Sequence, residues 1–275
     1  MRINTNLAAL NAWRNMTINN DKMSKSLEKL SSGYRVNRAA DDAAGLAVSE
    51  KMRAQIRGLN MAVRNAQDGV SLVQTAEGGA QKIQDMLQRM RELAVQASND
   101  TLTDPDRALL QEEFQNLIQE IDRTANSTKF NTKALIDGSV AGTTLTIQVG
   151  PGTSTSADHI TISLQALDAA ALQVDGLNIN NVTAAQAAIN QLDSAINDVS
   201  TARANFGALQ NRLEAAIETL LIQAENLTAA ESRIRDVDMA QEMANFTKFQ
   251  ILQQASTAML AQANVAPQSI LSLLR

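Results

Sequence analysis

Ladders of apolar side chains at three- and four-residue spacing run through both ends of this chain. Near the N-terminus the ladder reads Ala9, Trp13, Met16, Asn20, Met23, Leu27, Leu30 and Tyr34. Near the C-terminus it reads Met239, Met243, Phe246, Phe249, Leu252, Ser256, Met259 and Ala263. Each ladder is one stripe of an α-helix, and a long apolar stripe has to be buried against another surface. We therefore expect the two ends to pair with each other and then to pack against other copies of the chain.

The composition favours long helices with thin cores. Apolar residues make up 44% of the 275 residues, but only seven are aromatic, and only three prolines occur. The net charge is −5 with both signs interspersed, so a nucleic-acid backbone is not an expected partner. Cysteine is absent, which excludes disulfides and thiolate metal sites. No apolar run approaches the ~18 residues of a membrane span, so we expect no membrane partner.

Two further helices are predicted after the N-terminal ladder. The stretch 44–98 carries a regular ladder that takes one extra three-residue step at Ala76, close to Gly78-Gly79. Such a step overwinds a coiled coil locally, and glycine permits a close approach there. Asp41 or Asp42 is expected to cap this helix. The next helix is predicted over 104–127, with Asp104 as its cap.

The region 130–177 has a different pattern, because two alternating β-branched runs flank a glycine-rich turn and predict a β-hairpin. The spacing Thr183-x-x-Gln186 predicts a capping box that opens a helix over 183–228. Polar residues at ladder positions of the long helices are candidates for register control: Asn20, Arg203, Gln210 and Ser256. The terminal helix is expected to end before Pro267, and the apolar tail after it to be buried in an assembly.

Candidate chemistry is sparse. His159 is the only histidine and is expected to be a surface residue, because a zinc site or an acid–base pair would need partners that the chain lacks. The adjacent carboxylates Asp41-Asp42 and Glu112-Glu113 cannot face each other on a helix, so neither pair predicts an acid–base dyad. We expect no cofactor, no catalytic residue and no metal site, and hence not an enzyme.

Arg89 and Leu93 lie four residues apart, beside the predicted buried stripe. They share one helix face, and an outward Leu beside an Arg suits a protein contact. From spacing alone, a solvated helix edge is the favoured interpretation.

Several long segments resemble bacterial flagellins, the subunits of the flagellar filament. The resemblance covers the chain to about Leu135 and again from about Ala187 to Arg275. It is carried by the segments LSSGYRVNRAADDAAGLAVSEKMRAQIRGL, NAQDGVSLVQTAEG, LQRMRELAVQASNDT, EIDRTANSTKFN and ENLTAAESRIRDVDMAQEMANFTKFQILQQASTAMLAQAN. The short middle resembles the minimal form of the family, which lacks variable outer domains.

The resemblance implies a mainly α fold. Long antiparallel helices form a coiled-coil-like rod with a small β-hairpin, and the N- and C-terminal segments form a terminal-helix coiled coil. The implied domains are residues 1–40 and 233–275 for the inner coiled coil and 41–232 for the helical rod. The residues expected to form the self-assembly core are Trp13, Met16, Met23, Leu27, Leu30, Met243, Phe246, Phe249, Leu252, Met259, Leu273 and Leu274.

The resemblance also implies partners and a location. The subunit is expected to be secreted unfolded by flagellar type III export, in line with the missing signal peptide, and to polymerise outside the cell into a hollow helical filament that gives swimming motility. An export chaperone would bind the segment from about 234 to 275, and filament cap and hook–filament junction proteins are further expected partners. The terminal segments are expected to be disordered in the monomer.

A receptor contact follows from the same resemblance. In members sensed by the flagellin-detecting Toll-like receptor of the host, an Arg and a Leu of a QRxRELA motif and a Glu on the next helix make the contact. Arg89, Leu93 and Glu113 match these positions.

Three rival hypotheses remain: a hook–filament junction protein, a secreted enzyme on a flagellin-like scaffold, and a cytoplasmic coiled-coil regulator. The enzyme would need paired histidines, and the regulator would not need an apolar C-terminal tail.

Overall fold

The chain forms two compact units. The computed structural model describes residues 6–140, 142–155 and 157–273, with the backbone alone for 140 and 266–273. The terminal unit comprises Met1–Ile56 and Glu225–Arg275, and the central unit comprises Arg57–Ala224. Both divisions fall inside helices, α2 (Ala43–Ala97) and α4 (Val182–Arg235). The expected boundaries at 40/41 and 232/233 lie instead in the segment before α2 and within the last turn of α4.

The C-terminal part of α2 runs through the core of the central unit. Its fully buried residues follow the predicted ladder, including the extra three-residue step at Ala76: Ala66, Val73, Ala76, Ala80, Ile83, Leu87, Met90, Ala94 and Ala97. A Cβ at Gly79 would lie 2.7 Å from the Thr128 Oγ1 atom and 2.9 Å from the Ile136 Cδ1 atom, whereas Gly78 faces open space. The predicted close approach is therefore confirmed for Gly79, where a larger residue would displace the segment 128–136.

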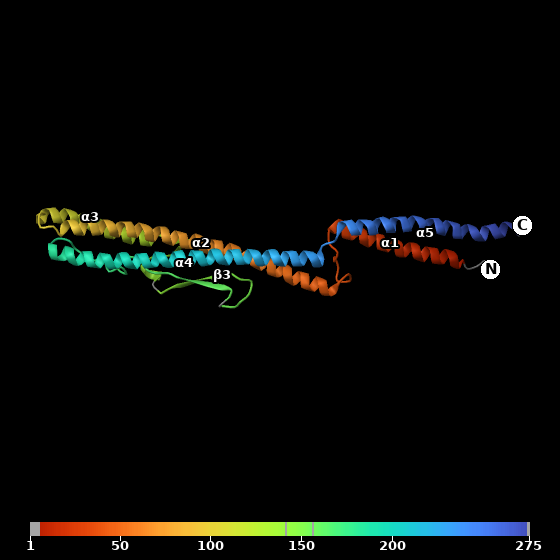
Figure 1. Cartoon of the computed structure of the whole chain (residues 1–275), viewed down its shortest axis with the longest axis horizontal. Coiled ribbons are helices and arrows are strands. Elements are labelled where there is room, and N and C mark those ends of the chain that lie inside the picture. The colour runs from red at the N-terminus through yellow and green to blue at the C-terminus, as the bar shows by residue number, and fades with distance from the viewer. Residues whose placement is uncertain (1–5, 141, 156, 274–275) are drawn as a thin grey trace. The chain divides into compact units, whose positions relative to one another are not determined.

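Helix α3 (Asp104–Ser127) returns along α2 and has the predicted bounds, but its capping residue differs from the prediction (Figure 1). Thr103 is the N-cap instead of Asp104, and its backbone N–H and hydroxyl both donate to the Asp106 carboxylate at 3.1 and 2.6 Å. These bonds lower the pKa of Asp106, the hydroxyl bond being the larger cause. Asp104 was a plausible cap by residue type, but Thr103 with an acidic residue three positions on completes a capping box.

The predicted hairpin is confirmed. Strands β3 (Thr144–Gln148) and β4 (His159–Ser163) pair antiparallel, with Ile147 opposite Ile160. The hairpin lies on the helices, because the Asn65 side chain of α2 donates to the Gln148 carbonyl at 3.2 Å. Smaller elements precede it and were not predicted: β1 (Lys129–Phe130), β2 (Lys133–Ala134) and the 3₁₀ turn η1 (Gly138–Val140).

The loop 164–181 contributes to the core although it contains no regular element. Leu167, Ala169, Val174 and Ile179 are fully buried. The loop is held by side chains of α3, since Asp122 accepts from the Ala169 N–H at 2.8 Å and Gln111 accepts from the Ile179 N–H at 2.6 Å. These residues lack helix or strand periodicity, so their burial could not be predicted from spacing.

Helix α4 begins at Val182 and continues to Arg235, beyond the expected end at 228. The Asn181 side chain caps it by accepting from the Ala184 N–H at 2.7 Å. The predicted capping box at Thr183 is wrong, because Thr183 is already inside the first turn. Across the part of the chain that the structure describes, no helix is long and apolar enough to span a membrane.

Arg107 provides a test of the central unit. It is 7% exposed, and its guanidinium donates to the carbonyls of Ala97 and Asn99 at 3.0 and 3.1 Å, where α2 ends. We expect Arg107→Ala to lower the free energy of unfolding by about 2–4 kcal/mol, because two carbonyls lose a charged donor. Urea unfolding followed by circular dichroism measures this change. The exposed pair of Arg123 with Glu120 is the matched control, and Arg123→Ala should cost much less than Arg107→Ala; equal costs would contradict this role of Arg107.

Candidate functional site: the terminal helix pair

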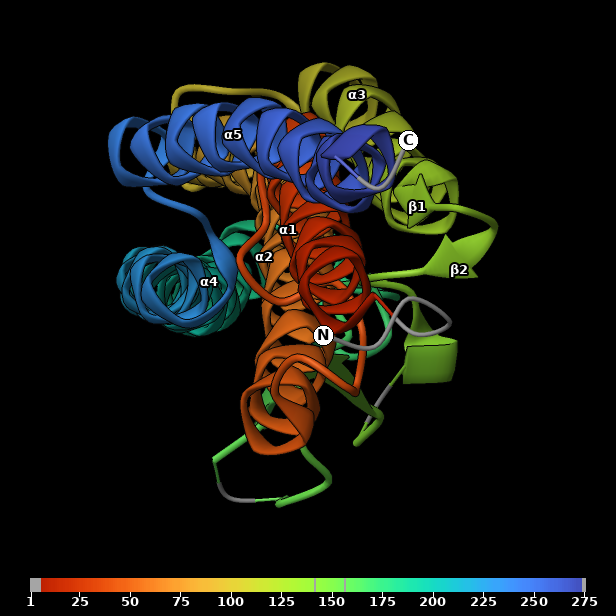
Figure 2. The ribbon, with the colours of Figure 1, turned by 90° about the vertical axis from the view of Figure 1, so that its right-hand side faces the viewer.

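Helices α1 (Leu7–Ser32) and α5 (Met239–Leu273) pack against each other in the terminal unit (Figures 1 and 2). They run antiparallel, because positions that rise along α1 meet positions that fall along α5. The Asn19 side chain donates to the Ser256 hydroxyl at 3.1 Å, and the Gln253 side chain donates to Asn20 at 3.4 Å. The predicted pairing of the two chain ends is thereby observed.

The predicted ladder of each terminal helix divides between an inward and an outward side, where one buried stripe was predicted. The inward stripes of α1 and α5 are half-buried in their mutual contact and include five of the expected core residues: Met16, Met23, Leu30, Phe246 and Phe249. The outward side chains are exposed and include the other five whose side chains are described: Trp13, Leu27, Met243, Leu252 and Met259. Leu273 ends α5 with its side chain undescribed, and Leu274 lies outside the described residues.

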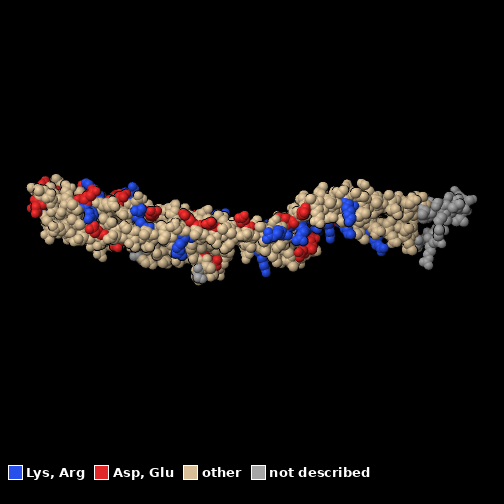
Figure 3. Space-filling view, in the orientation of Figure 1, with Lys and Arg blue, Asp and Glu red and all other residues tan. Residues whose placement is uncertain are grey.

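The pair has almost no core of its own. Among the residues of α1 and α5 whose side chains are described, only Ser26 is buried. Further large apolar side chains are also exposed on the two helices: Leu7, Leu10, Ile18, Met239, Ile251 and Val265. The stretch 249–274 contains no charged residue, and Figure 3 shows a largely uncharged surface over the described part of the pair. Helices that are apolar on several faces are found in interiors, so this pair has the surface of a buried element.

Pro267 lies inside α5 and does not follow it, so the predicted helix end is wrong. A proline in a helix removes the N–H that would bond to the carbonyl four residues earlier, here that of Ala263. The Asn6 side chain donates to this Ala263 carbonyl at 2.8 Å. The missing backbone bond is thus replaced from the opposite helix, which explains how α5 continues past the proline.

The segment between α1 and α2 is joined to the segment between α4 and α5. Tyr34 and Asp236 form an antiparallel bridge, with the Arg35 N–H donating to the Arg235 carbonyl at 2.6 Å. The Arg235 guanidinium lies 4.7 Å from the centre of the Tyr34 ring and donates to Glu50 at 2.7 Å. This contact lowers the pKa of Glu50, with the hydrogen bond from Arg235 as its largest cause. The bridge fixes where α1 and α5 start to run together.

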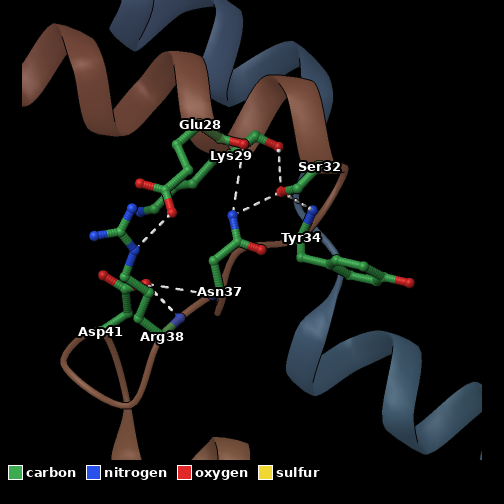
Figure 4. A network of polar contacts seen from close by, with 7 residues as sticks. All are labelled: Glu28, Lys29, Ser32, Tyr34, Asn37, Arg38 and Asp41. Atoms are coloured by element: carbon green, nitrogen blue, oxygen red, sulfur yellow. Dashed lines mark hydrogen bonds and ion pairs between the residues drawn. The ribbon is translucent and has the colours of Figure 1, made fainter.

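A second polar network holds the turn between α1 and α2 (Figure 4). Asn37 donates to the Ser32 hydroxyl at 2.7 Å, and Arg38 pairs with Glu28 at 2.9 Å. The Asp41 carboxylate accepts from the Arg38 and Asn37 backbone N–H groups, and the pKa of Asp41 is lowered, chiefly by the bond from Arg38. Asp42 caps α2 by accepting from the Gly45 N–H at 2.9 Å. Asp41 therefore holds the turn, and the adjacent Asp42 caps the helix.

Three of the four candidate register residues bond across helices. Asn20 and Ser256 bond across the α1–α5 pair, as described above. Arg203 of α4 donates to Gln84 of α2 at 2.6 Å and pairs with Glu77 at 3.3 Å. Gln210 bonds within its own helix, to Glu214 at 3.0 Å, so it does not link helices.

The three candidate receptor residues lie together but differ in exposure. The exposed Arg89 pairs with Glu113 of α3 at 2.9 Å and with Glu92 at 2.9 Å, and these contacts raise the pKa of Arg89, the hydrogen bond to Glu92 being the largest cause. Leu93 is 1% exposed, so the expected outward orientation of this side chain is wrong. The buried stripe is wider here because α3 and α4 flank α2 on two sides, as the pairs Arg89–Glu113 and Arg91–Asp193 indicate.

No catalytic constellation involves the remaining candidates. His159 is half-buried at the start of β4, and its Nδ1 atom has no hydrogen-bond partner in the described structure. Glu112 is exposed beside Glu113 on α3. Within the described ranges, no group of three His, Asp or Glu residues could hold a metal ion.

The sequence comparisons point to one family. The profile of the bacterial flagellin N-terminal helical region matches residues 3–141, and that of the C-terminal helical region matches residues 189–274. A flagellin of Halalkalibacterium halodurans is 54% identical and a flagellin of Bacillus subtilis is 48% identical, each over 100% of both chains.

The structural comparisons agree. A crystal structure of Bacillus cereus flagellin aligns with 61% of this chain and 94% of its own, with 34% identity and a TM-score of 0.51. A hook-associated protein of Vibrio parahaemolyticus, 16% identical, aligns with 71% of this chain and 100% of its own at a TM-score of 0.61, which reflects a shared fold.

A subunit built of long helices, whose terminal helix pair exposes apolar side chains on several sides, belongs to the class of self-assembling structural proteins. The chain belongs to the bacterial flagellin family, in the minimal form without variable outer domains. It is a structural subunit of the flagellar filament.

Asp41 makes the stability of the turn between α1 and α2 depend on pH. Its folded pKa lies below the ordinary value of 3.8, so its stabilising effect is complete above pH 3.8 and is lost as the pH falls through the lower folded value. We expect Asp41→Asn to lower the thermal dissociation temperature of assembled filaments at neutral pH, and the difference from wild type to disappear in strong acid. Turbidity melts at a series of pH values measure this difference; a difference that grows in acid would contradict the assignment.

Proposed function

We propose that the filament assembles because the outward side chains of α1 and α5 are buried against other copies of the chain. The observation that carries this proposal is a pair of helices, 26 and 35 residues long, with Ser26 as the only buried residue among those whose side chains are described. Homopolymerisation is the way for one kind of subunit to supply the missing surface. The α1–α5 pair then forms the inner tube of the filament.

The magnitudes support this mechanism. Eleven large apolar side chains of the two helices are exposed, and burying the remaining surface of each contributes about 1 kcal/mol. The sum is on the order of 10 kcal/mol per subunit, which is comparable to the whole net stability of a folded domain. Without neighbouring copies this term is missing, so the terminal segments stay unfolded in the monomer and fold on joining the filament.

The remaining partners follow from the family. The subunit leaves the cell unfolded through flagellar type III export and is extracellular, after a chaperone has held the segment from about 234 to 275. It joins the filament beneath a cap protein, and the first copies contact a hook–filament junction protein. It acts as a structural subunit without cofactor or catalysis.

The rival function is that of a hook–filament junction protein. The likeness to a hook-associated protein at 16% identity concerns the fold. Flagellins that are 54% and 48% identical over the full length favour the filament subunit.

A charge among the outward side chains of α1 and α5 tests the assembly mechanism. We expect Trp13→Asp, Leu27→Asp and Met259→Asp each to abolish seeded polymerisation, because a charge would be buried against neighbouring copies. The central unit should keep its helix content and unfolding temperature, since these residues lie outside it. Negative-stain microscopy and circular dichroism measure the two effects.

The matched control is an exposed polar residue on the same pair. Asn11→Asp adds the same charge to α1, but at a position that contributes no apolar surface, and should disturb polymerisation less than Trp13→Asp. Filaments of normal length from all three charged variants would rule out the mechanism.

We further propose that the monomer is recognised by the host's flagellin-sensing Toll-like receptor through the surface around Arg89 and Glu113. Their ion pair fixes two exposed charges in one orientation. Leu93 supports this surface from below, because it is 1% exposed. In the assembled filament, neighbouring subunits cover this face.

Receptor signalling assays separate contact from support. We expect Arg89→Ala and Glu113→Ala to reduce signalling by at least about tenfold at unchanged unfolding temperature, consistent with the loss of a charged contact. Leu93→Ala should reduce signalling together with stability, by about 2–5 kcal/mol, because it leaves a cavity. Arg123→Ala, which removes an exposed arginine elsewhere on α3, is the control. Unchanged signalling by Arg89→Ala would refute the receptor assignment.

A further inference from the structure

Helix α2 carries an exposed basic patch in the central unit, which we define as Arg57, Asn60, Met61 and Arg64. At about 100° per residue, Arg57, Met61 and Arg64 lie on one face. The buried residues Leu59 and Ala66 lie about half a turn away. The patch is therefore the side of α2 opposite to its core contact.

The basic patch is hollowed, and within it the Arg64 guanidinium donates to the Met61 sulfur atom. Its four residues line a hollow of about 560 Å³ on the surface. Met61 is 49% exposed at this hollow. Neither Arg57 nor Arg64 forms an ion pair with any residue that the structure describes. An apolar side chain with flanking carboxylates would fit such a surface.

Helix α4 carries that complement on its own exposed face, an acidic patch defined as Glu214, Glu218, Leu221 and Ile222. Leu221 and Ile222 are 50% and 52% exposed, and both glutamates are exposed. Glu214 accepts a bond from Gln210, and Glu218 forms no ion pair with any described residue. The buried residues of this part of α4, Leu213 and Leu220, lie on another side of the helix.

We propose that the basic patch on α2 of one copy binds the acidic patch on α4 of a neighbouring copy. Leu221 and Ile222 enter the hollow at Met61, and Glu218 pairs with Arg64. The occupant is a second copy because this chain itself presents the matching charges and apolar side chains. Within one chain the two patches cannot meet, since each helix turns its opposite side to the core of the same unit.

The two patches are different surfaces, so the contact is heterologous. A contact of this kind leaves one free patch at each end of every pair and generates rings or open helical assemblies instead of closed dimers. The inference rests on the proposed self-assembly and specifies a lateral contact made by the central unit. It is independent of the outward stripes of α1 and α5.

Charge reversal and mixing test the contact. We expect Arg64→Glu and Glu218→Arg each to raise the critical concentration for seeded polymerisation of the full chain by at least about tenfold. The double variant, in which the pair is reversed, should return to within about threefold of wild type. An equimolar mixture of the two single variants should also polymerise, because the reversed patches bind each other and the intact patches bind each other.

The controls separate this inference from the proposed function. Lys133→Glu and Glu112→Arg reverse exposed charges elsewhere in the central unit that form no ion pair with any residue the structure describes, and combining them should give no rescue. Circular dichroism and unfolding temperature should be unchanged in all variants. If wild-type chains polymerise and the single reversals do so equally well, or if the double variant is as defective as the singles, the contact is refuted while self-assembly stands. Failure of wild-type chains to polymerise on seeds would instead refute the self-assembly mechanism.

Discussion

Burial of the outward apolar side chains of α1 and α5 is the constraint on which the rest of this structure depends. The two helices meet along a narrow seam of half-buried residues, and their other faces stay apolar and uncovered. A chain that carried such faces without a partner would aggregate. Filament formation uses the same surface productively, because the neighbouring copies are identical and the contact can repeat.

The polar contacts of the terminal unit set geometry more than they supply stability. Exposed ion pairs contribute little individually, and the pair Arg38–Glu28 is of this kind, whereas Arg235 is largely buried in its pair with Glu50. Their value lies in fixing where each helix begins. The Tyr34–Asp236 bridge aligns the end of α1 with the start of α5, and the bond from Asn6 to the Ala263 carbonyl aligns the start of α1 with the C-terminal part of α5. A subunit that must repeat identically along a filament needs such a fixed register.

The periodicity of apolar residues, at helix spacing or at strand spacing, predicted the regular elements well. The ladder of α2 was predicted with its extra step at Ala76, and so was the hairpin of β3 and β4. Periodicity could not predict how many sides of a helix are covered, which depends on tertiary packing. For that reason Leu93 was expected to face outward and is buried, and the ladders of α1 and α5 were each expected to be buried on one side and are divided between an inward and an outward side. The capping residues Thr103 and Asn181 were missed because neighbouring residues had equally suitable side chains. The continuation of α5 through Pro267 depends on Asn6, which lies 257 residues from its bonding partner.

Hydrogen exchange of α1 and α5, compared between purified monomers and seeded filaments by mass spectrometry, tests the central claim most directly. Protection of a backbone amide measures the free energy of local opening. The account predicts little protection of both helices in the monomer and strong protection in the filament, with the central unit protected in both states. Equal protection of α1 and α5 in monomer and filament would contradict it, because the pair would then be stable without the surfaces of other copies.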